Sequence, residues 1–73
     1  MNAWADVRWR LERIGKKPAD LVLAVRERLP PGETLYHQDL AGYVSGRMMY
    51  PKRDRVLPIV YEVLENWEKE AGV

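Results

Sequence analysis

The chain has 73 residues, no cysteine, one histidine and a formal net charge of +1. A chain of this size buries only about 60% of the surface that it exposes when unfolded, so we expect one domain over residues 1–73 without a large internal cavity. The composition excludes a disulfide framework and thiolate zinc sites, and a single histidine leaves metal ions with poor ligands. No metal and no cofactor are therefore expected.

The hydropathy pattern argues for a soluble, cytoplasmic protein with no membrane partner. The longest uninterrupted apolar run, Leu21 to Val25, is far too short to cross a bilayer. The amino terminus also lacks the basic region and apolar stretch of a secretory signal.

Charge is divided unevenly along the chain. Residues 1–60 carry eleven Lys or Arg against seven Asp or Glu, whereas residues 61–73 carry one against four. Because an excess of positive charge attracts an anionic partner, a polyanion would bind to the first sixty residues.

The first predicted helix covers about residues 3 to 14. Four apolar residues recur at steps of three and four and form its buried stripe: Trp4, Val7, Leu11 and Ile14. Asn2 can cap the start of this helix and Gly15 its end. Trp9 falls almost opposite the stripe, so it is either a partly covered surface aromatic or a contact for a partner.

Proline and glycine delimit the second predicted helix. Pro18 suits its first position because the ring fixes a helical φ, and the apolar run that follows continues the helix to about Leu29. Pro30, Pro31 and Gly32 then end it, and Pro31-Gly32 suits the middle of a type II turn, since glycine accepts the positive φ that this turn needs.

The third predicted helix covers about residues 35 to 46 and can be capped by Thr34. Its inward face comprises Leu40, Tyr43 and Val44, flanked by His37 and Arg47. Its outward face carries Gln38, Gly42 and Ser45, with Asp39 beside them. A glycine inside a helix costs about 1 kcal/mol relative to alanine. We therefore expect a close neighbour at Gly42, which could be a nucleic acid or another helix of the same fold.

The segment after Gly46, RMMYPKRDR, is a basic loop in which Pro51 ends the third helix. Asp54 can cap the last helix, which runs through Glu70, with Pro58 near its first turn. Its apolar stripe comprises Val56, Ile59, Val60, Val63, Leu64 and Trp67. The whole pattern predicts an all-α fold, a compact four- to five-helix bundle with no strand.

The sequence contains no convincing set of catalytic residues. The one candidate acid-base set is His37 with Asp39 or Ser45, and these side chains point in different directions from a short helix. No phosphate-binding glycine loop or cofactor motif is found, so an enzyme is not expected.

DNA binding requires only a helix that fits a groove and cations that bind phosphates, and the third helix and the basic loop supply both. A helix of about three turns fits the major groove, where glutamine can bind adenine and an acid can accept from cytosine. Gln38 is the first expected base contact, followed by His37 and Asp39, while Gly42 and Ser45 would let the groove approach. The expected phosphate contacts are Lys16, Lys17, Arg47, Lys52, Arg53 and Arg55. The predicted partner is double-stranded DNA.

At these residues the sequence resembles a known family. YVSGRMMYPKRDRVLPI looks like the end of the recognition helix and the start of the next helix in Cro and lambda-repressor-like helix-turn-helix regulators. The shared features are Tyr43, Ser45-Gly46-Arg47, Pro51, Val56-Leu57 and Ile59. The resemblance covers about residues 35 to 64 and implies a phage or mobile-element transcriptional regulator that binds an operator, commonly as a dimer.

This chain departs from the family pattern in one respect. The segment LPPGET lengthens the turn between the two motif helices by about six residues, which alters the angle between them. A homodimer is an implication of the resemblance. Within the sequence, only Trp9 and the acidic last helix support it, since that helix could meet a basic surface of a second copy.

Two alternatives remain open. The third helix could instead support a reading element formed by the basic loop and the last helix, as in winged-helix regulators, although the chain ends too soon for a wing. The protein could also be an interaction module, such as an antirepressor, an antitoxin-like protein or a phage accessory protein. Its contacts would be Trp9, Trp67 and Met48–Tyr50, because methionine and aromatic residues favour adaptable interfaces.

Overall fold

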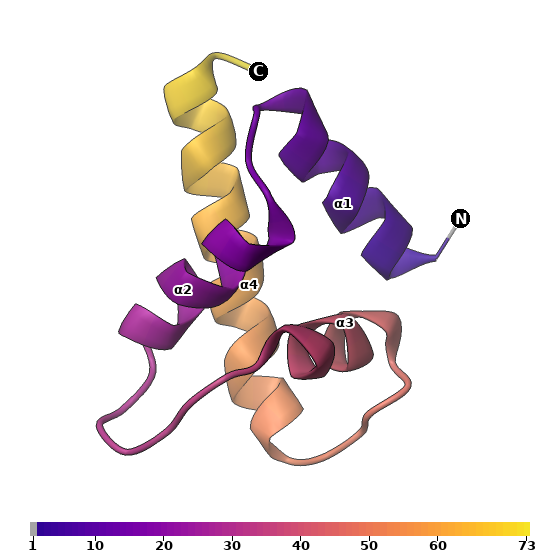
Figure 1. Cartoon of the computed structure of the whole chain (residues 1–73), viewed down its shortest axis with the longest axis vertical. Helices are drawn as coiled ribbons and strands as arrows, with labels where there is room; N and C mark the ends of the chain where they lie inside the picture. The colour runs from indigo at the N-terminus through magenta and orange to yellow at the C-terminus, as the bar shows by residue number, and fades with distance from the viewer. Residues whose placement is uncertain (1) are drawn as a thin grey trace.

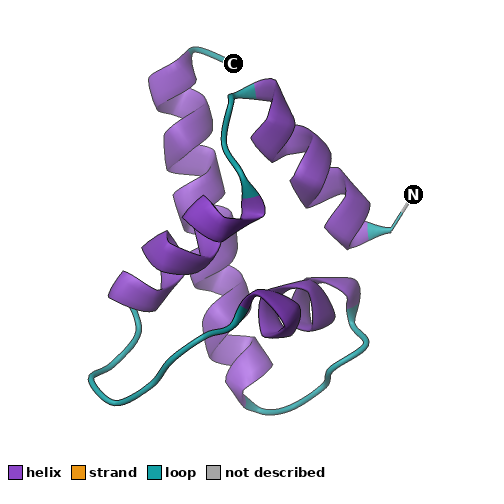
Figure 2. Ribbon diagram, viewed as in Figure 1, coloured by secondary structure: helices purple, strands orange, loops and turns teal. Residues whose placement is uncertain are grey.

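Four α-helices make up the fold in the computed structural model, which describes residues 2–73. They are α1 (Ala3–Arg13), α2 (Pro18–Glu27), α3 (His37–Ser45) and α4 (Lys52–Ala71) (Figure 1). Loops connect them, and no β-strand occurs between residues 2 and 73 (Figure 2). The predicted all-helical class and the number of helices are confirmed.

The longest helix, α4, supports the other three. It runs along the long dimension of the molecule, and α2 crosses it and packs on it (Figure 1). The short helix α3 packs against α1, α2 and α4. The radius of gyration, 11.7 Å, is close to the roughly 11 Å expected for a compact chain of this length.

All four helices contribute to one hydrophobic core. The buried apolar residues are Val7, Leu11, Leu21, Val22, Val25, Leu29, Leu35, Leu40, Tyr43, Val44, Val56, Val60, Val63 and Leu64. Trp67 is half-buried and packs against this core, so it completes the apolar stripe of α4 as predicted. Burial of these side chains supplies the main driving force for folding.

Three local signals at helix ends and turns are confirmed. The Asn2 Oδ1 atom accepts a hydrogen bond from the Ala5 N–H at 2.7 Å, so Asn2 caps α1. Gly15 follows the end of that helix with a φ of +74°. In the predicted turn, Gly32 has a φ of +89° and the Glu33 N–H donates to the Pro30 carbonyl at 3.1 Å.

The predicted starts of α3 and α4 are wrong. Thr34 does not cap α3, which begins at His37 because Tyr36 still has an extended backbone and is the N-cap residue. α4 begins at Lys52, since Pro51 already has helical dihedral angles, and Asp54 therefore lies inside the first turn. Pro58 falls beyond the first turn and leaves the Asp54 carbonyl without its helical N–H donor.

The loop between α2 and α3, residues 28–36, is held at several points. The Arg26 guanidinium donates to the Leu35 carbonyl through Nε and Nη2. The Lys52 ammonium donates to the Thr34 carbonyl, and Arg55 forms an ion pair with Glu33. This loop is thus tied to α2 and to the start of α4.

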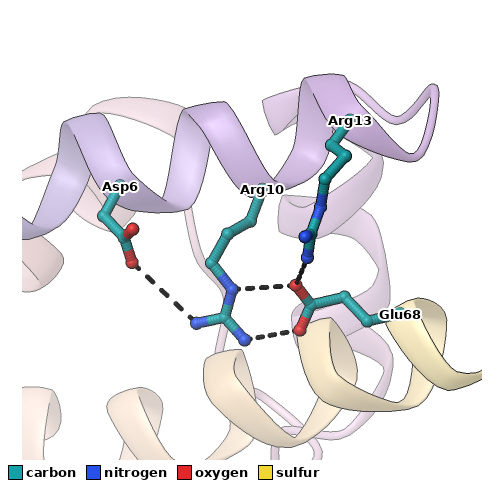
Figure 3. A network of polar contacts seen from close by, with 4 residues as sticks. All are labelled: Asp6, Arg10, Arg13 and Glu68. Carbon is teal, nitrogen blue, oxygen red and sulfur yellow. Dashed lines mark hydrogen bonds and ion pairs between the residues drawn. The ribbon is translucent and has the colours of Figure 1, made fainter. Parts of the chain in front are cut away.

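Glu68, on α4, is buried although it carries a charge, with 9% of its surface exposed. Its Oε1 accepts from Arg10 Nη2 at 2.5 Å, and its Oε2 accepts from Arg10 Nε at 3.0 Å and from Arg13 Nη2 at 2.7 Å (Figure 3). These bonds join α1 to α4. At this residue, the acidic last helix meets basic side chains of its own chain, not of a second copy as the sequence had suggested.

The network also sets the charge state of its members. Hydrogen bonding from Arg10 lowers the pKa of the Glu68 carboxyl, against the opposing effect of burial. The same hydrogen bond raises the pKa of the Arg10 guanidinium. Both groups are therefore charged at neutral pH.

Replacing Glu68 with glutamine should lower the free energy of unfolding by about 1–3 kcal/mol, because two guanidinium groups lose the counter-charge that they share. Urea denaturation at pH 7 measures this change. Glu70→Gln is the matched control, since Glu70 is exposed on the same helix. Equal losses in the two variants would show that the network adds nothing to stability.

The lowered pKa of Glu68 predicts a dependence of stability on pH. The folded state binds this proton less tightly than the unfolded state does, so the contribution is complete above the pKa of an unfolded glutamate, about 4.3, and is lost as the pH falls through the folded pKa. Thermal melts between neutral and acidic pH should reveal the loss in the wild type. The Glu68→Gln variant should lack this part of the curve, and identical curves for both proteins would contradict the assignment.

Candidate nucleic-acid interface

One face of α3 packs into the hydrophobic core. Leu40, Tyr43 and Val44 are buried there, as the sequence predicted. Burial raises the pKa of the Tyr43 phenol, so this side chain stays neutral and packs as part of the core. The side of α3 away from the core is only partly open, because Gln38 and Ser45 are exposed there whereas Gly42 is buried.

Three of the predicted base contacts are exposed on α3. They are His37, Gln38 and Ser45, while Asp39 is half-buried. The His37 ring lies 6.3 Å from the Trp4 ring in an edge-to-face arrangement, so it packs against α1. The Ser45 hydroxyl donates to the Gly42 carbonyl at 3.2 Å. Gln38 is exposed, and none of the hydrogen bonds found within residues 2–73 involves its side-chain amide.

The expectation that Gly42 faces outward is wrong. Gly42 is buried, and a Cβ atom placed on it would contact Met48 Sδ and lie 2.7 Å from Met48 Cγ. The chain reverses at Gly46, which has a φ of +81°, and the Met48 N–H donates to the Gly42 carbonyl at 3.1 Å. The close neighbour expected at Gly42 is therefore the Met48 side chain, in the loop after α3. Gly42 is buried, so it is not a base contact.

Gly42→Ala tests this contact. Alanine should gain about 1 kcal/mol of helix propensity but should crowd the Met48 side chain at a comparable or greater cost. Combining Gly42→Ala with Met48→Ala should relieve the crowding and give a favourable coupling energy of about 1–3 kcal/mol in a double-mutant cycle. The control cycle pairs Gly42→Ala with Met49→Ala, since Met49 is exposed and should be additive. Additivity in both cycles would refute the packing.

Some of the predicted phosphate contacts already bond to other groups of the same chain, and others do not. Arg53 Nε donates to the Tyr43 carbonyl at 2.7 Å, Lys52 donates to the Thr34 carbonyl, and Arg55 pairs with Glu33. Arg47 is exposed, and within residues 2–73 its guanidinium forms no hydrogen bond, ion pair or cation–π contact. Arg47 is thus the free cation of the basic loop within residues 2–73.

The two lysines before α2 belong to another part of the molecule. The Lys16 ammonium lies 4.9 Å from the centre of the Trp67 ring, near the end of α4. Lys52 begins that helix, so Lys52 and Trp67 are separated by about 22 Å along its axis at 1.5 Å per residue. Lys17 is exposed, and its N–H donates to the Asp20 carboxylate at 2.9 Å. The structure does not gather Lys16 with the basic loop.

An exposed aromatic residue at the start of α3 escaped the sequence analysis. Tyr36 directly precedes the helix and is exposed, whereas Leu35 beside it is buried. In an extended segment, neighbouring side chains point to opposite sides, so this pair of residues carried the signal. Tyr36 is the N-cap residue of α3 and has an extended backbone.

The residues of the alternative interaction surface fall into two groups. Trp9, Met49 and Tyr50 are exposed by 55%, 70% and 62%. Trp67 and Met48 are half-buried and pack against the core. Only the first group could form the main contact with a partner.

No protein-family model, curated protein or solved structure matches this chain. The resemblance to Cro and lambda-repressor-like regulators thus stays a prediction from the sequence. None of the helices within residues 2–73 has the length and apolar character needed to span a membrane. Across the same residues, no three His, Asp or Glu side chains are grouped as a metal site would require.

Proposed function

We propose that this chain is a sequence-specific double-stranded DNA-binding protein, a transcriptional regulator of the phage or mobile-element repressor type that acts in the cytoplasm. Its α3 helix enters the major groove, and residues 47–55 lie along the phosphates. The observation that carries this proposal is the exposed, unbonded amide of Gln38 on a helix whose opposite face is packed into the core.

The dimensions of α3 fit this role. An α-helix with its side chains is about 10–12 Å in diameter, which fits the major groove of B-DNA, about 12 Å wide, and the nine residues of α3 span about 13 Å along the helix axis. Gln38 can make a bidentate contact with adenine. The His37 ring packs against Trp4, and the Ser45 hydroxyl is already bonded to the Gly42 carbonyl and the Arg47 N–H, so Gln38 is the main base contact in this proposal. Tyr36 can add a contact to phosphate or sugar.

The cations divide into two roles in this proposal. Arg47 is free to bind phosphate at the end of α3. Arg53 fixes the end of that helix through the Tyr43 carbonyl and keeps further N–H groups for a phosphate. Lys52 also retains donors, whereas the charge of Arg55 is largely balanced by Glu33.

Two substitutions separate base reading from phosphate binding. Arg47→Ala should weaken binding to all duplexes and reduce the log-log salt slope by about 1, whereas Gln38→Ala should mainly relax sequence preference, at a cost of about 1–3 kcal/mol on the preferred site. Selection from a random duplex library supplies the site, and titrations at several salt concentrations measure the affinities.

The matched controls are Lys69→Ala for the cation and Asn66→Ala for the amide, since both residues are exposed toward the far end of α4. Neither should change DNA binding. The proposal fails if the wild type selects no sequence, or if Asn66→Ala alters sequence preference as much as Gln38→Ala does.

A protein-interaction module is the second candidate, and the exposure of Met49 and Tyr50 in the loop before α4 favours it. Methionine and aromatic side chains supply adaptable apolar contacts. A protein partner bound through this loop would give an affinity that is nearly independent of salt, in contrast to DNA.

A further inference from the structure

Two neighbouring methionines in the loop between α3 and α4 have different surroundings (Figure 1). Met49 is 70% exposed, whereas Met48 is half-buried and packs against the hydrophobic core. The three atoms nearest to a Cβ built on Gly42 are Sδ, Cγ and Cβ of Met48. The Met48 thioether therefore contacts the backbone of α3, while most of Met49 is open to solvent.

The contact at Gly42 leaves no room for another atom between the Met48 sulfur and the helix. A Cβ atom on this glycine would lie 2.7 Å from Met48 Cγ and closer still to Sδ, which is nearer than side-chain atoms approach one another in a packed protein. The Met48 N–H donates to the Gly42 carbonyl at 3.1 Å and holds the two residues together. An atom added to the sulfur on this side must therefore push the loop away from α3.

The Met48 sulfur is also chemically reactive. The chain has no cysteine, so methionine thioethers are its groups most readily oxidised by peroxides. A lone pair of Sδ attacks one oxygen of hydrogen peroxide, so that an S–O bond forms while the O–O bond breaks and hydroxide leaves. The hydroxide then removes the proton from the new S–OH group. The products are a sulfoxide and water, with the sulfur oxidised and the peroxide reduced.

We propose that Met48 is a site of reversible oxidation by hydrogen peroxide, and that its sulfoxide loosens the packing of the loop on α3. A sulfoxide oxygen on the Gly42 side needs space that even a Cβ lacks. An oxygen on the other side makes polar a side chain that packs against the core, which is costly. Met49 is under neither constraint, because it is exposed.

A time course of the full chain in hydrogen peroxide tests the site. Peptide mass spectrometry measures the fraction of each methionine that is oxidised, and circular dichroism measures the Tm. Met49 should react first because it is more exposed, and the Tm should fall by about 5 °C or more only as Met48 is oxidised. A Met48 that stays unoxidised in the folded protein, or a Tm that falls with the oxidation of Met49, would overturn the proposal.

Met48→Leu and Met49→Leu form a matched pair for the same treatment. Leucine conserves much of the volume of methionine but has no sulfur, and each variant is compared with its own untreated form, so any change in starting stability cancels. Peroxide should leave the Tm of Met48→Leu unchanged, whereas Met49→Leu should lose as much as the wild type. Equal losses in the two variants would refute the assignment to Met48.

A glutamine substitution tests the effect of the polar atom without any oxidant. Glutamine has a length close to that of methionine and carries a polar oxygen, as a sulfoxide does. Met48→Gln should therefore lower the Tm by about 5 °C or more, while Met49→Gln should change it by less than about 2 °C. A Met48→Gln variant as stable as Met49→Gln would show that the site tolerates a polar atom, contrary to the proposal.

The consequence for DNA rests on the proposed function, because α3 is the helix assigned there to the major groove. Oxidation of Met48 should weaken duplex binding about 10-fold, and methionine sulfoxide reductases should restore it. A chain that binds no duplex but loses stability as Met48 is oxidised supports the oxidation site and counts against the proposed function. Unchanged duplex affinity after the Tm has fallen overturns the link to DNA binding alone.

Discussion

The buried carboxylate of Glu68 fixes how the first helix sits on the last. Hydrophobic burial is not directional, so Val7 and Leu11 alone would allow α1 some rotation about its axis. Hydrogen bonds from two guanidinium groups remove that freedom, because the forked geometry of Arg10 matches the carboxylate. The outward direction of Trp9 follows from this arrangement, since Arg13 lies between the carboxylate and the indole ring.

The position of α3 depends on polar contacts at both of its ends. Helix ends leave backbone groups without helical partners, and here the neighbouring loops supply many of the missing ones. Arg26 binds the Leu35 carbonyl before the helix, and Arg53 and the Met48 N–H bind carbonyls in its last turn. Much of the basic loop is thus a structural element that keeps α3 still. A helix that reads DNA needs such rigidity, because small displacements misalign side chains with base edges.

The exposed side chains of α3 and of the outer face of α1 lie on different helices and differ in chemistry. α3 presents the exposed amide of Gln38, with Arg47 shortly after the helix. The outer face of α1 presents the Trp9 ring, with the Arg13 guanidinium 4.9 Å from its centre. Trp4 and His37 link the two helices on a different side of α1. Changes on one surface can therefore leave the other intact.

The sequence by itself determined the local structure: the helical periods, the cap at Asn2, the turn at Gly32 and the inward face of α3. These features depend on residues a few positions apart, where geometry is set by backbone dihedral angles and helical repeat. Only the tertiary structure decided which groups far apart in the chain pair. Glu68 meets Arg10 across 58 residues, and Arg53 meets the Tyr43 carbonyl from the next helix. Even the nearby pair of Met48 and Gly42 meets only because the chain reverses at Gly46. Such pairings depend on the path of the whole chain, and no local repeat encodes that path.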